Sequence, residues 1–245
     1  MKALIPAAGL GTRWYPWSKL IPKELLPLAN YPAIHYILEE AVAAGILEIG
    51  IIINKAKKLV KNYVEKIWRL AHPGINVKWF YQSSPRGVGH ALLCARDWIQ
   101  DEPTAVLYPD ELHPQKGGIN QLYRAYKKFP GCWIGITINK QKRRQAIYEI
   151  LKTEANVFLI NGFGYENHSQ EIGYGTGRYI LGSGLDYLAN FFCKNEQNTK
   201  KQWDDNIVLE PLFDKEILGI ALNEPIFDIG TPENYSIATS MMYRS

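Results

Sequence analysis

Cysteine is scarce in this sequence, and its scarcity excludes a disulfide framework. The three cysteines, Cys94, Cys132 and Cys193, lie far apart and in apolar surroundings. Widely spaced cysteines in odd number are typical of a reducing compartment, where they behave as small buried hydrophobic residues. We therefore expect a cytoplasmic protein whose core contains no disulfide bond.

Long apolar runs and a strong charge bias are also missing. The opening run, MKALIPAA, is shorter than the apolar part of a secretory signal, and no stretch approaches the roughly 20 apolar residues of a membrane-spanning helix. Lys and Arg number 28 against 24 Asp and Glu, which gives a formal net charge of +4. This mild excess does not indicate binding to nucleic acid or membranes, although it suits a site for anionic substrates.

Several motifs of common enzyme classes are absent. The segment Gly9–Trp14 lacks the third glycine of a dinucleotide fingerprint, and no P-loop of the form GxxxxGK[ST] occurs. Asn54-Lys55 stands where a dehydrogenase would need an acidic residue, and Asp110-Glu111-Leu112 is not the DxD motif of a glycosyltransferase. The five histidines show no metal-binding spacing. These absences count against a nicotinamide-dependent dehydrogenase and a glycosyltransferase.

Strand and helix patterns alternate along the first part of the chain. Buried strands are predicted at 2–8, 48–54, 77–82 and 104–111, and helices at 32–45, 59–68 and 90–99. Strands that alternate with helices form βαβ units with parallel pairing. We therefore predict an α/β fold, with a Rossmann-like, mostly parallel mixed sheet flanked by helices.

The pattern after residue 130 is looser. It predicts a strand at 132–139, a hairpin from 145–152 and 156–162, a strand at 177–181 and helices at 184–192 and 205–213. A strand, a turn and a helix follow, with Thr231 as N-cap and Pro232 at the first helical position. Because no linker, repeat or low-complexity run occurs, we expect one domain over residues 1–245.

Four unusual segments fall at the carboxyl ends of predicted strands: Gly9–Lys23, Gln82–Gly89, Asp110 and Asp228. Ligands of open parallel sheets bind outside these ends, so the four segments are expected to converge. In the first segment, glycines allow backbone N–H groups to approach an anion, Arg13 adds a planar fork and Lys23 a compact charge. This favours a phosphate site over an ordinary surface loop.

The other segments supply carboxylates and an amide. Two separate carboxylates, Asp110 and Asp228, together with substrate phosphates are a common way to hold Mg²⁺, although each could instead cap a helix or shape a turn. The Gln82 amide offers both donors and an acceptor, which match the imide edge of uracil or thymine. Gly87 and Gly89 would let a base or ribose lie flat on the backbone.

Three stretches together carry a family resemblance. Residues 8–28 read AGLGTRWYPWSKLIPKELLPL, residues 82–111 run from QSSPRGVGHALLCARDW to LYPDE, and DIGTPENY follows near the end. They resemble the bacterial UTP–glucose-1-phosphate uridylyltransferases, which are sugar-1-phosphate nucleotidyltransferases; the likeness is close over residues 2–111 and thin afterwards. The resemblance implies a fold of the nucleotide-diphospho-sugar transferase type, with a nucleotide-binding half at 1–130 and a sugar-binding half at 131–245.

The same resemblance implies a reaction and roles for single residues. UTP and a sugar-1-phosphate, expected to be glucose-1-phosphate, would give UDP-sugar and pyrophosphate with Mg²⁺ as cofactor, and the enzyme would be a homo-oligomer. The uracil would be held by Ala8, Gly9, Gln82 and Gly87, and the triphosphate by Gly11, Thr12 and Arg13. Lys23 would neutralise charge on the phosphates during the transfer. Mg²⁺ would be held by Asp110 and Asp228.

The expected sugar contacts are Glu111, Glu166 and Asn167. In the family, an acid–lysine pair precedes a proline in this region and a glycine follows a tyrosine; here the lysine is missing from Tyr165-Glu166-Asn167, and Glu149 follows Tyr148. These departures leave alternatives open. One is an enzyme specific for dTTP or another sugar, and the other is a regulatory nucleotide-binding protein with impaired catalysis.

Overall fold

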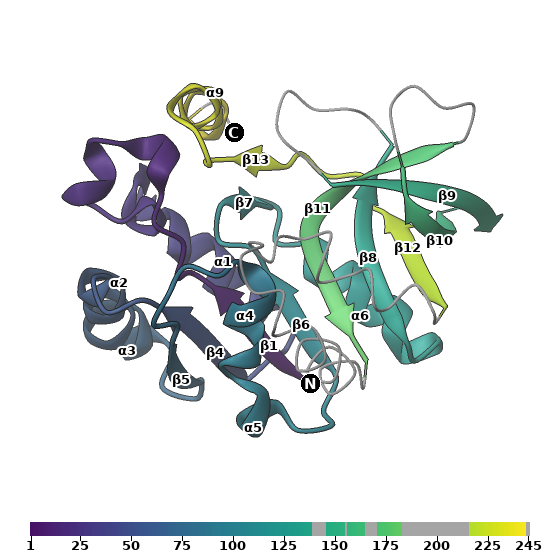
Figure 1. The fold of residues 1–245 in the computed structure, drawn as a ribbon, viewed down its shortest axis with the longest axis horizontal. Coiled ribbons are helices and arrows are strands. Elements are labelled where there is room, and N and C mark those ends of the chain that lie inside the picture. The colour runs from purple at the N-terminus through teal and green to yellow at the C-terminus, as the bar shows by residue number, and fades with distance from the viewer. Residues whose placement is uncertain (139–145, 155, 165–170, 183–215, 244–245) are drawn as a thin grey trace.

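The computed structural model describes residues 1–138, 146–154, 156–164, 171–182 and 216–243. Its centre is a nine-stranded mixed sheet in the order β5-β4-β1-β6-β11-β8-β12-β10-β9 (Figure 1). The strands are β1 (Lys2–Pro6), β4 (Glu48–Ile53), β5 (Asn76–Tyr81), β6 (Thr104–Leu107), β8 (Cys132–Thr137), β9 (Ile147–Glu154), β10 (Val157–Phe163), β11 (Ile172–Leu181) and β12 (Ile217–Ala221).

The sheet is parallel in the part that the first half of the chain builds. Strands β5, β4, β1 and β6 pair in parallel, so their carboxyl ends lie along one edge. Strand β11 runs antiparallel to β6 and β8, and β10 runs antiparallel to β12 and β9, whereas β12 is parallel to β8. The predicted mixed sheet is confirmed, but parallel pairing is limited to β5-β4-β1-β6 and to β8–β12, so the sheet is less parallel than predicted. The predicted hairpin is confirmed and is the β9–β10 pair.

Helices cover both faces of the sheet (Figure 1). One face packs against α1 (Ala33–Ala43), α6 (Gly118–Lys128) and a continuous helical run between them in the sequence. This run consists of α2 (Lys58–Tyr63), the π-helical turn η4 (Val64–Trp68) and α3 (Arg69–Ala71). The other face packs against α4 (Val88–Leu93) and α5 (Arg96–Ile99). Helix α6 was not predicted, because its eleven residues are mostly polar and only Gly118, Ile119 and Leu122 are buried.

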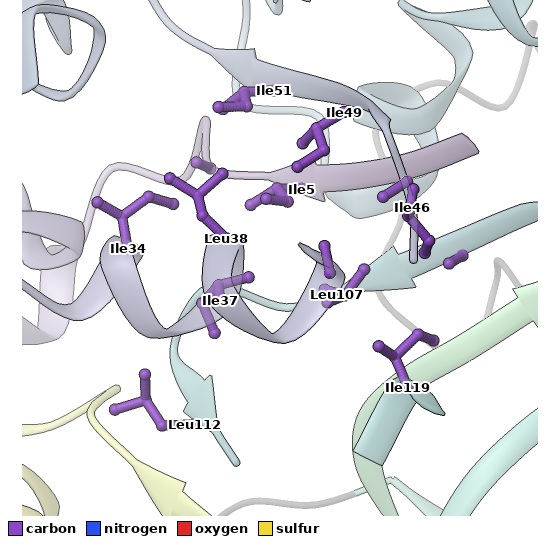
Figure 2. Close-up of a cluster of buried hydrophobic side chains, with 14 of the residues drawn as sticks. Ile5, Ile34, Ile37, Leu38, Ile46, Ile49, Ile51, Leu107, Leu112 and Ile119 are labelled. Atoms are coloured by element: carbon purple, nitrogen blue, oxygen red, sulfur yellow. The ribbon is translucent and has the colours of Figure 1, made fainter. Parts of the chain in front are cut away.

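Side chains from alternate strand positions build the two cores. On β4, Ile49, Ile51 and Ile53 belong to one buried cluster, while Ile52 belongs to the other. Figure 2 shows the first cluster, in which strand residues and Leu38 of α1 meet. Each fully buried isoleucine or leucine contributes about 1.5–3 kcal/mol relative to an exposed one. These two cores fix the positions of β1, β4 and β6 relative to one another, and with them the positions of their carboxyl ends.

The strand predicted at 104–111 ends early. Strand β6 stops at Leu107, and the N–H of Tyr108 makes one more hydrogen bond to β11, at the carbonyl of Gly177 (3.0 Å). Pro109 then has no backbone N–H with which to continue the ladder. The next residues form β7 (Glu111–Leu112), which pairs with β13 (Phe227–Asp228) in a separate two-stranded ribbon. The sequence predicts that Asp228 ends a strand of the main sheet. This prediction is wrong, because Asp228 belongs to the separate ribbon.

Among the remaining predicted helices, one is confirmed and one is found as two shorter helices. Helix α9 (Pro232–Met242) begins as predicted, with the Thr231 hydroxyl accepting a hydrogen bond from the N–H of Asn234 at 3.2 Å. The helix predicted at 90–99 is two short helices, α4 and α5. The helices predicted at 184–192 and 205–213 lie outside the described residues. Within the described ranges, no helix combines the length and the apolar character needed to cross a membrane.

Candidate active site

The glycine-rich segment after β1 folds into three short 3₁₀ turns, η1 (Thr12–Trp14), η2 (Trp17–Lys19) and η3 (Lys23–Leu25). Gly11 has φ 64°, the left-handed region that favours glycine, and it begins η1. Trp14 is buried, and its Nε1 donates a hydrogen bond to the carbonyl of Ile229 at 2.9 Å. This bond ties the loop to the C-terminal segment, while Thr12 and Arg13 remain exposed.

The β7–β13 ribbon brings the two predicted metal ligands together. Asp228 pairs with Glu111, and the N–H of Ile229 donates to the carbonyl of Asp110 at 2.8 Å. The Asp228 carboxylate accepts hydrogen bonds from the N–H of Gly230 and from Nδ2 of Asn234, both at 2.6 Å. Asp228 thus shapes the turn before α9, as the alternative interpretation expected, and also lies beside Asp110.

Lys23 forms a salt bridge with Asp110, and Arg13 Nη2 lies 4.0 Å from Asp110 Oδ2. Burial by itself lowers the pKa of Lys23, but the negative charges of Asp110 and Glu24 outweigh it, so the pKa is raised. Burial by itself raises the pKa of Asp110, but Lys23 outweighs it and the pKa is lowered. Both side chains are therefore charged at neutral pH.

Arg13 also lies next to the other carboxylate. A methyl group built on Gly230 would come within 2.8 Å of both Arg13 Nη2 and Asp228 Oδ1. The guanidinium and the two carboxylates consequently share one small region above the carboxyl ends of β1 and β6. Within the described residues, no group of three or more His, Cys, Asp or Glu could hold a metal ion. A metal bound by this acid pair would need ligand oxygens from phosphates.

A second, buried ion pair supports η3. Lys57 Nζ lies 2.7 Å from both carboxylate oxygens of Glu24, which is fully buried. Burial lowers the pKa of Lys57 in spite of this partner, and nearby Lys23 acts in the same direction. The pair joins the segment after β4 to the turn that contains Lys23. Sequence reasoning missed both residues, because Lys57 lies in the run NKAKK, which is typical of a solvated surface.

The residues predicted to hold the base follow β1 and β5, and Asn54, which follows β4, contacts the first of these segments. Asn54 Nδ2 donates to the carbonyl of Ala8 at 2.7 Å, which fixes the backbone next to the exposed Gly9. Gln82 Nε2 donates to the carbonyl of Gly87 at 2.9 Å and contacts His90 Nδ1 at 3.0 Å. Gly87 has φ 89° and precedes α4. Asn54 was not predicted as a site residue.

The predicted sugar contacts are only partly described. A methyl group built on Gly177 would lie 2.9 Å from Cδ and Oε2 of Glu111, and Gly177 has φ 66°, so glycine is needed here on both grounds. This places the Glu111 carboxyl against β11. Glu149 is half-buried on β9, where it pairs with Gly162 and Ile172. Glu166 and Asn167 lie outside the described residues.

Comparisons with known proteins identify the family of this chain and support its fold. The family model described as nucleotidyl transferase matches residues 2–239. The chain belongs to the nucleotidyl transferase family. It is 35% identical over 184 residues to the UTP–glucose-1-phosphate uridylyltransferase of Bacillus subtilis, a match that covers 66% of this chain and 63% of that protein. The match therefore spans less than two thirds of the Bacillus protein.

Two further relatives extend the comparison over more of the chain. UTP–glucose-1-phosphate uridylyltransferase 2 of Staphylococcus saprophyticus is 34% identical over 215 residues, covering 77% of this chain and 74% of that protein. A crystal structure of a UDP-glucose pyrophosphorylase complexed with UDP-glucose superposes with a TM-score of 0.84 at 26% identity, covering 99% of this chain and 98% of that chain. These relatives confirm the predicted resemblance and the fold.

In this nucleotidyl transferase, a fully buried arginine supports the segment that contains Asp110. The Arg178 guanidinium donates to the carbonyls of Tyr108 at 3.3 Å and Glu111 at 2.7 Å, on either side of Asp110. Its Nη2 also lies 2.7 Å from Oε2 of Glu40, and neither side chain is exposed. Arg178 was not predicted, because GRYIL shows only an apolar strand pattern around it.

Proposed function

We propose that this chain transfers a uridylyl group from UTP to glucose-1-phosphate, giving UDP-glucose and pyrophosphate. The observation that carries the proposal is the cluster of Arg13, Lys23, Asp110 and Asp228 at the carboxyl edge of the parallel strands. The names of the relatives support UTP and glucose-1-phosphate as the substrates. A dTTP-specific enzyme and a regulatory protein are less well supported, because the relatives are named as uridylyltransferases.

The proposed chemistry is a direct displacement at phosphorus. A phosphate oxygen of the sugar-1-phosphate forms a bond to the α-phosphorus of UTP, while the bond between the α-phosphorus and the bridging oxygen breaks and pyrophosphate leaves. The attacking phosphate is ionised at neutral pH, so no general base is required. The work of this chain is to align the two substrates and to stabilise the charge on the phosphates.

The two cations at the site are placed before substrate binds. Gly11, Thr12 and Arg13 would hold the triphosphate, and Lys23 would neutralise the transferred phosphate. The salt bridge to Asp110 keeps Lys23 charged and oriented in the free protein. A charge that is already in position needs little reorganisation during the reaction, and this is the basis of electrostatic catalysis.

We also propose that Asp110 and Asp228 hold Mg²⁺. The donor set fits this metal, since it offers the carboxylate of Asp228 on β13 and that of Asp110 directly before β7. Each carboxylate has about four lone-pair positions, of which the observed contacts use only some. When bound, Mg²⁺ would withdraw charge from phosphate oxygens. Glu111, together with Glu166 and Asn167, is proposed to contact the sugar.

A reducing, cytoplasmic location is proposed on the basis of the cysteines. Among the described residues, neither Cys94 nor Cys132 forms a disulfide bond. Free thiols are typical of proteins in a compartment that keeps cysteine reduced.

The proposal is tested by pyrophosphate release from UTP and from dTTP with a panel of sugar-1-phosphates, with and without Mg²⁺. We expect release of pyrophosphate with UTP and glucose-1-phosphate, and loss of this release when a chelator removes Mg²⁺.

Asp110→Asn should abolish activity at limiting Mg²⁺, because it removes an anionic ligand from a hard cation. The control, Asp101→Asn, changes an exposed acid before the amino end of β6. Full activity of Asp110→Asn at limiting Mg²⁺ would contradict the metal site.

A further inference from the structure

The Gln82 side chain is held at two points. It follows β5, is 5% exposed, and its backbone N–H donates to the carbonyl of Ile53 at 2.9 Å. Its amide nitrogen lies 2.9 Å from the carbonyl oxygen of Gly87 and 3.0 Å from Nδ1 of His90, on the first turn of α4. The amide group is therefore fixed in the plane that these two contacts define.

The chemistry of the two contacts decides how the amide is oriented. A backbone carbonyl oxygen only accepts hydrogen bonds, so the amide atom beside Gly87 must be the nitrogen. An amide nitrogen carries two hydrogens, and the second points to Nδ1 of His90. This ring nitrogen must accept, so His90 is neutral, with its proton on Nε2. Burial lowers the pKa of His90, and Arg86 lowers it further, which agrees with a neutral ring.

The amide oxygen is the end that remains for a ligand. Among the residues that the structure describes, no hydrogen bond reaches Oε1 of Gln82, whereas both amide hydrogens are engaged. The sequence suggested that Gln82 would offer both donors and an acceptor to a base. The structure changes this expectation, since the free end of the amide can only accept.

We propose that His90 is a positioning residue for base selection: by engaging the second amide hydrogen of Gln82, it leaves Oε1 as the atom of this amide that contacts the base. An acceptor pairs with the ring N3–H of uracil or thymine, and it repels the ring N3 of cytosine, which is itself an acceptor. His90 thus favours imide bases without separating uracil from thymine. The inference rests on the proposed function, in which the nucleotide is UTP.

Removal of His90 should relax this selection. In His90→Ala the second amide hydrogen has no partner, so the amide can turn its nitrogen toward a cytosine N3 at the cost of one hydrogen bond to Gly87. We expect the ratio of kcat/KM for UTP to that for CTP, with glucose-1-phosphate as acceptor, to fall on the order of 10-fold. In His90→Asn, the Oδ1 atom can take the place of Nδ1, and the ratio should stay near that of the unaltered protein.

The matched control is His35→Ala. His35 is also half-buried, on α1, and its Nδ1 contacts the hydroxyl of Tyr63 at 3.0 Å, far along the chain from Gln82. This variant should keep the selectivity for UTP. If His90→Ala fails to fold by circular dichroism, His90→Asn and His90→Gln provide the comparison, since only asparagine places an oxygen at the Nδ1 position. Selectivity should then be retained in His90→Asn and lowered in His90→Gln.

Two results would overturn the inference. One is an unchanged ratio of UTP to CTP in a folded His90→Ala or His90→Gln variant, and the other is a ring ¹⁵N NMR spectrum in which Nδ1 of His90 carries a proton at neutral pH. Failure of the proposed function is distinguishable, because the unaltered protein would then form no UDP-glucose. In that case calorimetric titration with UTP and CTP measures the same selectivity without turnover.

Discussion

Positively and negatively charged side chains alternate along a row at the candidate site. Arg13 lies near Asp110, Asp110 binds Lys23, Lys23 is next to Glu24 in the chain, and Glu24 binds Lys57. Each of these side chains therefore has an oppositely charged neighbour, which offsets part of the cost of placing charge in a partly buried region. The row places Lys23 between two carboxylates. This position explains why the pKa of the lysine is raised and why its side chain is already oriented.

Replacement of Lys23 tests this row most directly. Lys23→Ala should lower kcat on the order of 100-fold, since it removes one preorganised charge from the phosphates. The matched control is Lys19→Ala, on the exposed side of η2, which should keep its turnover. Steady-state kinetics with UTP and glucose-1-phosphate measure the effect, and circular dichroism checks the fold. Turnover of Lys23→Ala at the level of the unaltered protein would remove Lys23 from the mechanism.

The sequence predicted the charged residues at the strand ends better than the buried residues that hold them in place. Arg13, Lys23 and Asp110 were predicted and lie together, because unusual residues at the ends of apolar strands are visible in a linear pattern. Glu24 and Lys57 were not, since a buried ion pair between distant segments has no local signature. The roles assigned to the predicted residues stay predictions.

At the scale of elements, the β7–β13 ribbon determines the geometry of the site. It lies outside the main sheet, and it joins the segment after β6 to the segment before α9 (Figure 1). Local patterns correctly predicted α1, β4 and α9. They could not predict a pairing of two-residue strands, because such strands have no periodicity and their partner is distant in the sequence. The division of the chain into two halves near residue 130 likewise stays a prediction.

Gly230, which follows this ribbon, should be needed for activity rather than for stability. The added methyl group of Gly230→Ala would lie 2.8 Å from Arg13 Nη2 and from Asp228 Oδ1, which are the ends of side chains that can shift. We expect kcat/KM for UTP to fall on the order of 10-fold, in line with displacement of one charged contact, with little change in Tm.

The control for this substitution is Gly131→Ala, where no heavy atom lies within 4 Å of the added methyl group. It should change neither quantity. A Gly230→Ala variant with unaltered kcat/KM would show that the position of Arg13 beside Asp228 does not matter for UTP. A large drop in Tm would show that the methyl group disturbs the turn before α9 instead.

At the scale of the whole molecule, a buried ionic network joins elements from both ends of the chain. Glu40 on α1 binds Arg178 on β11, and its Oε1 also accepts from the N–H of Ile119 at 2.8 Å. His113 lies nearby, with Nδ1 3.0 Å from Glu224 Oε1 and Nε2 3.0 Å from the carbonyl of Thr176. Since Arg178 also holds the backbone around Asp110, the network connects the stability of the fold to the site.

The ionisation of Glu40 should make the stability of the protein depend on pH. Burial by itself raises the pKa of Glu40, but Arg178 and His113 outweigh it, so the pKa in the folded protein is lowered from 4.5. A carboxyl group with a lowered pKa contributes stability above its unfolded pKa, and this contribution is lost as the pH falls through its folded pKa. Glu40→Gln removes the charge and leaves Arg178 buried without its ionic partner. At pH 7 this should lower the free energy of unfolding by about 3–5 kcal/mol.

The difference between the unaltered protein and Glu40→Gln should therefore narrow as the pH falls below 4.5, because Glu40 becomes protonated and loses the charge that the variant already lacks. Urea unfolding monitored by circular dichroism at pH 7 and at successive acidic pH values measures this difference. Glu216→Gln, at an exposed position before β12, is the matched control and should show a small difference at every pH. A difference for Glu40→Gln that stays constant or grows in acid would mean that Glu40 is already protonated in the folded protein. The bond to Arg178 would then be a hydrogen bond to a neutral acid, and the link between α1 and the segment around Asp110 would be weaker than an ion pair.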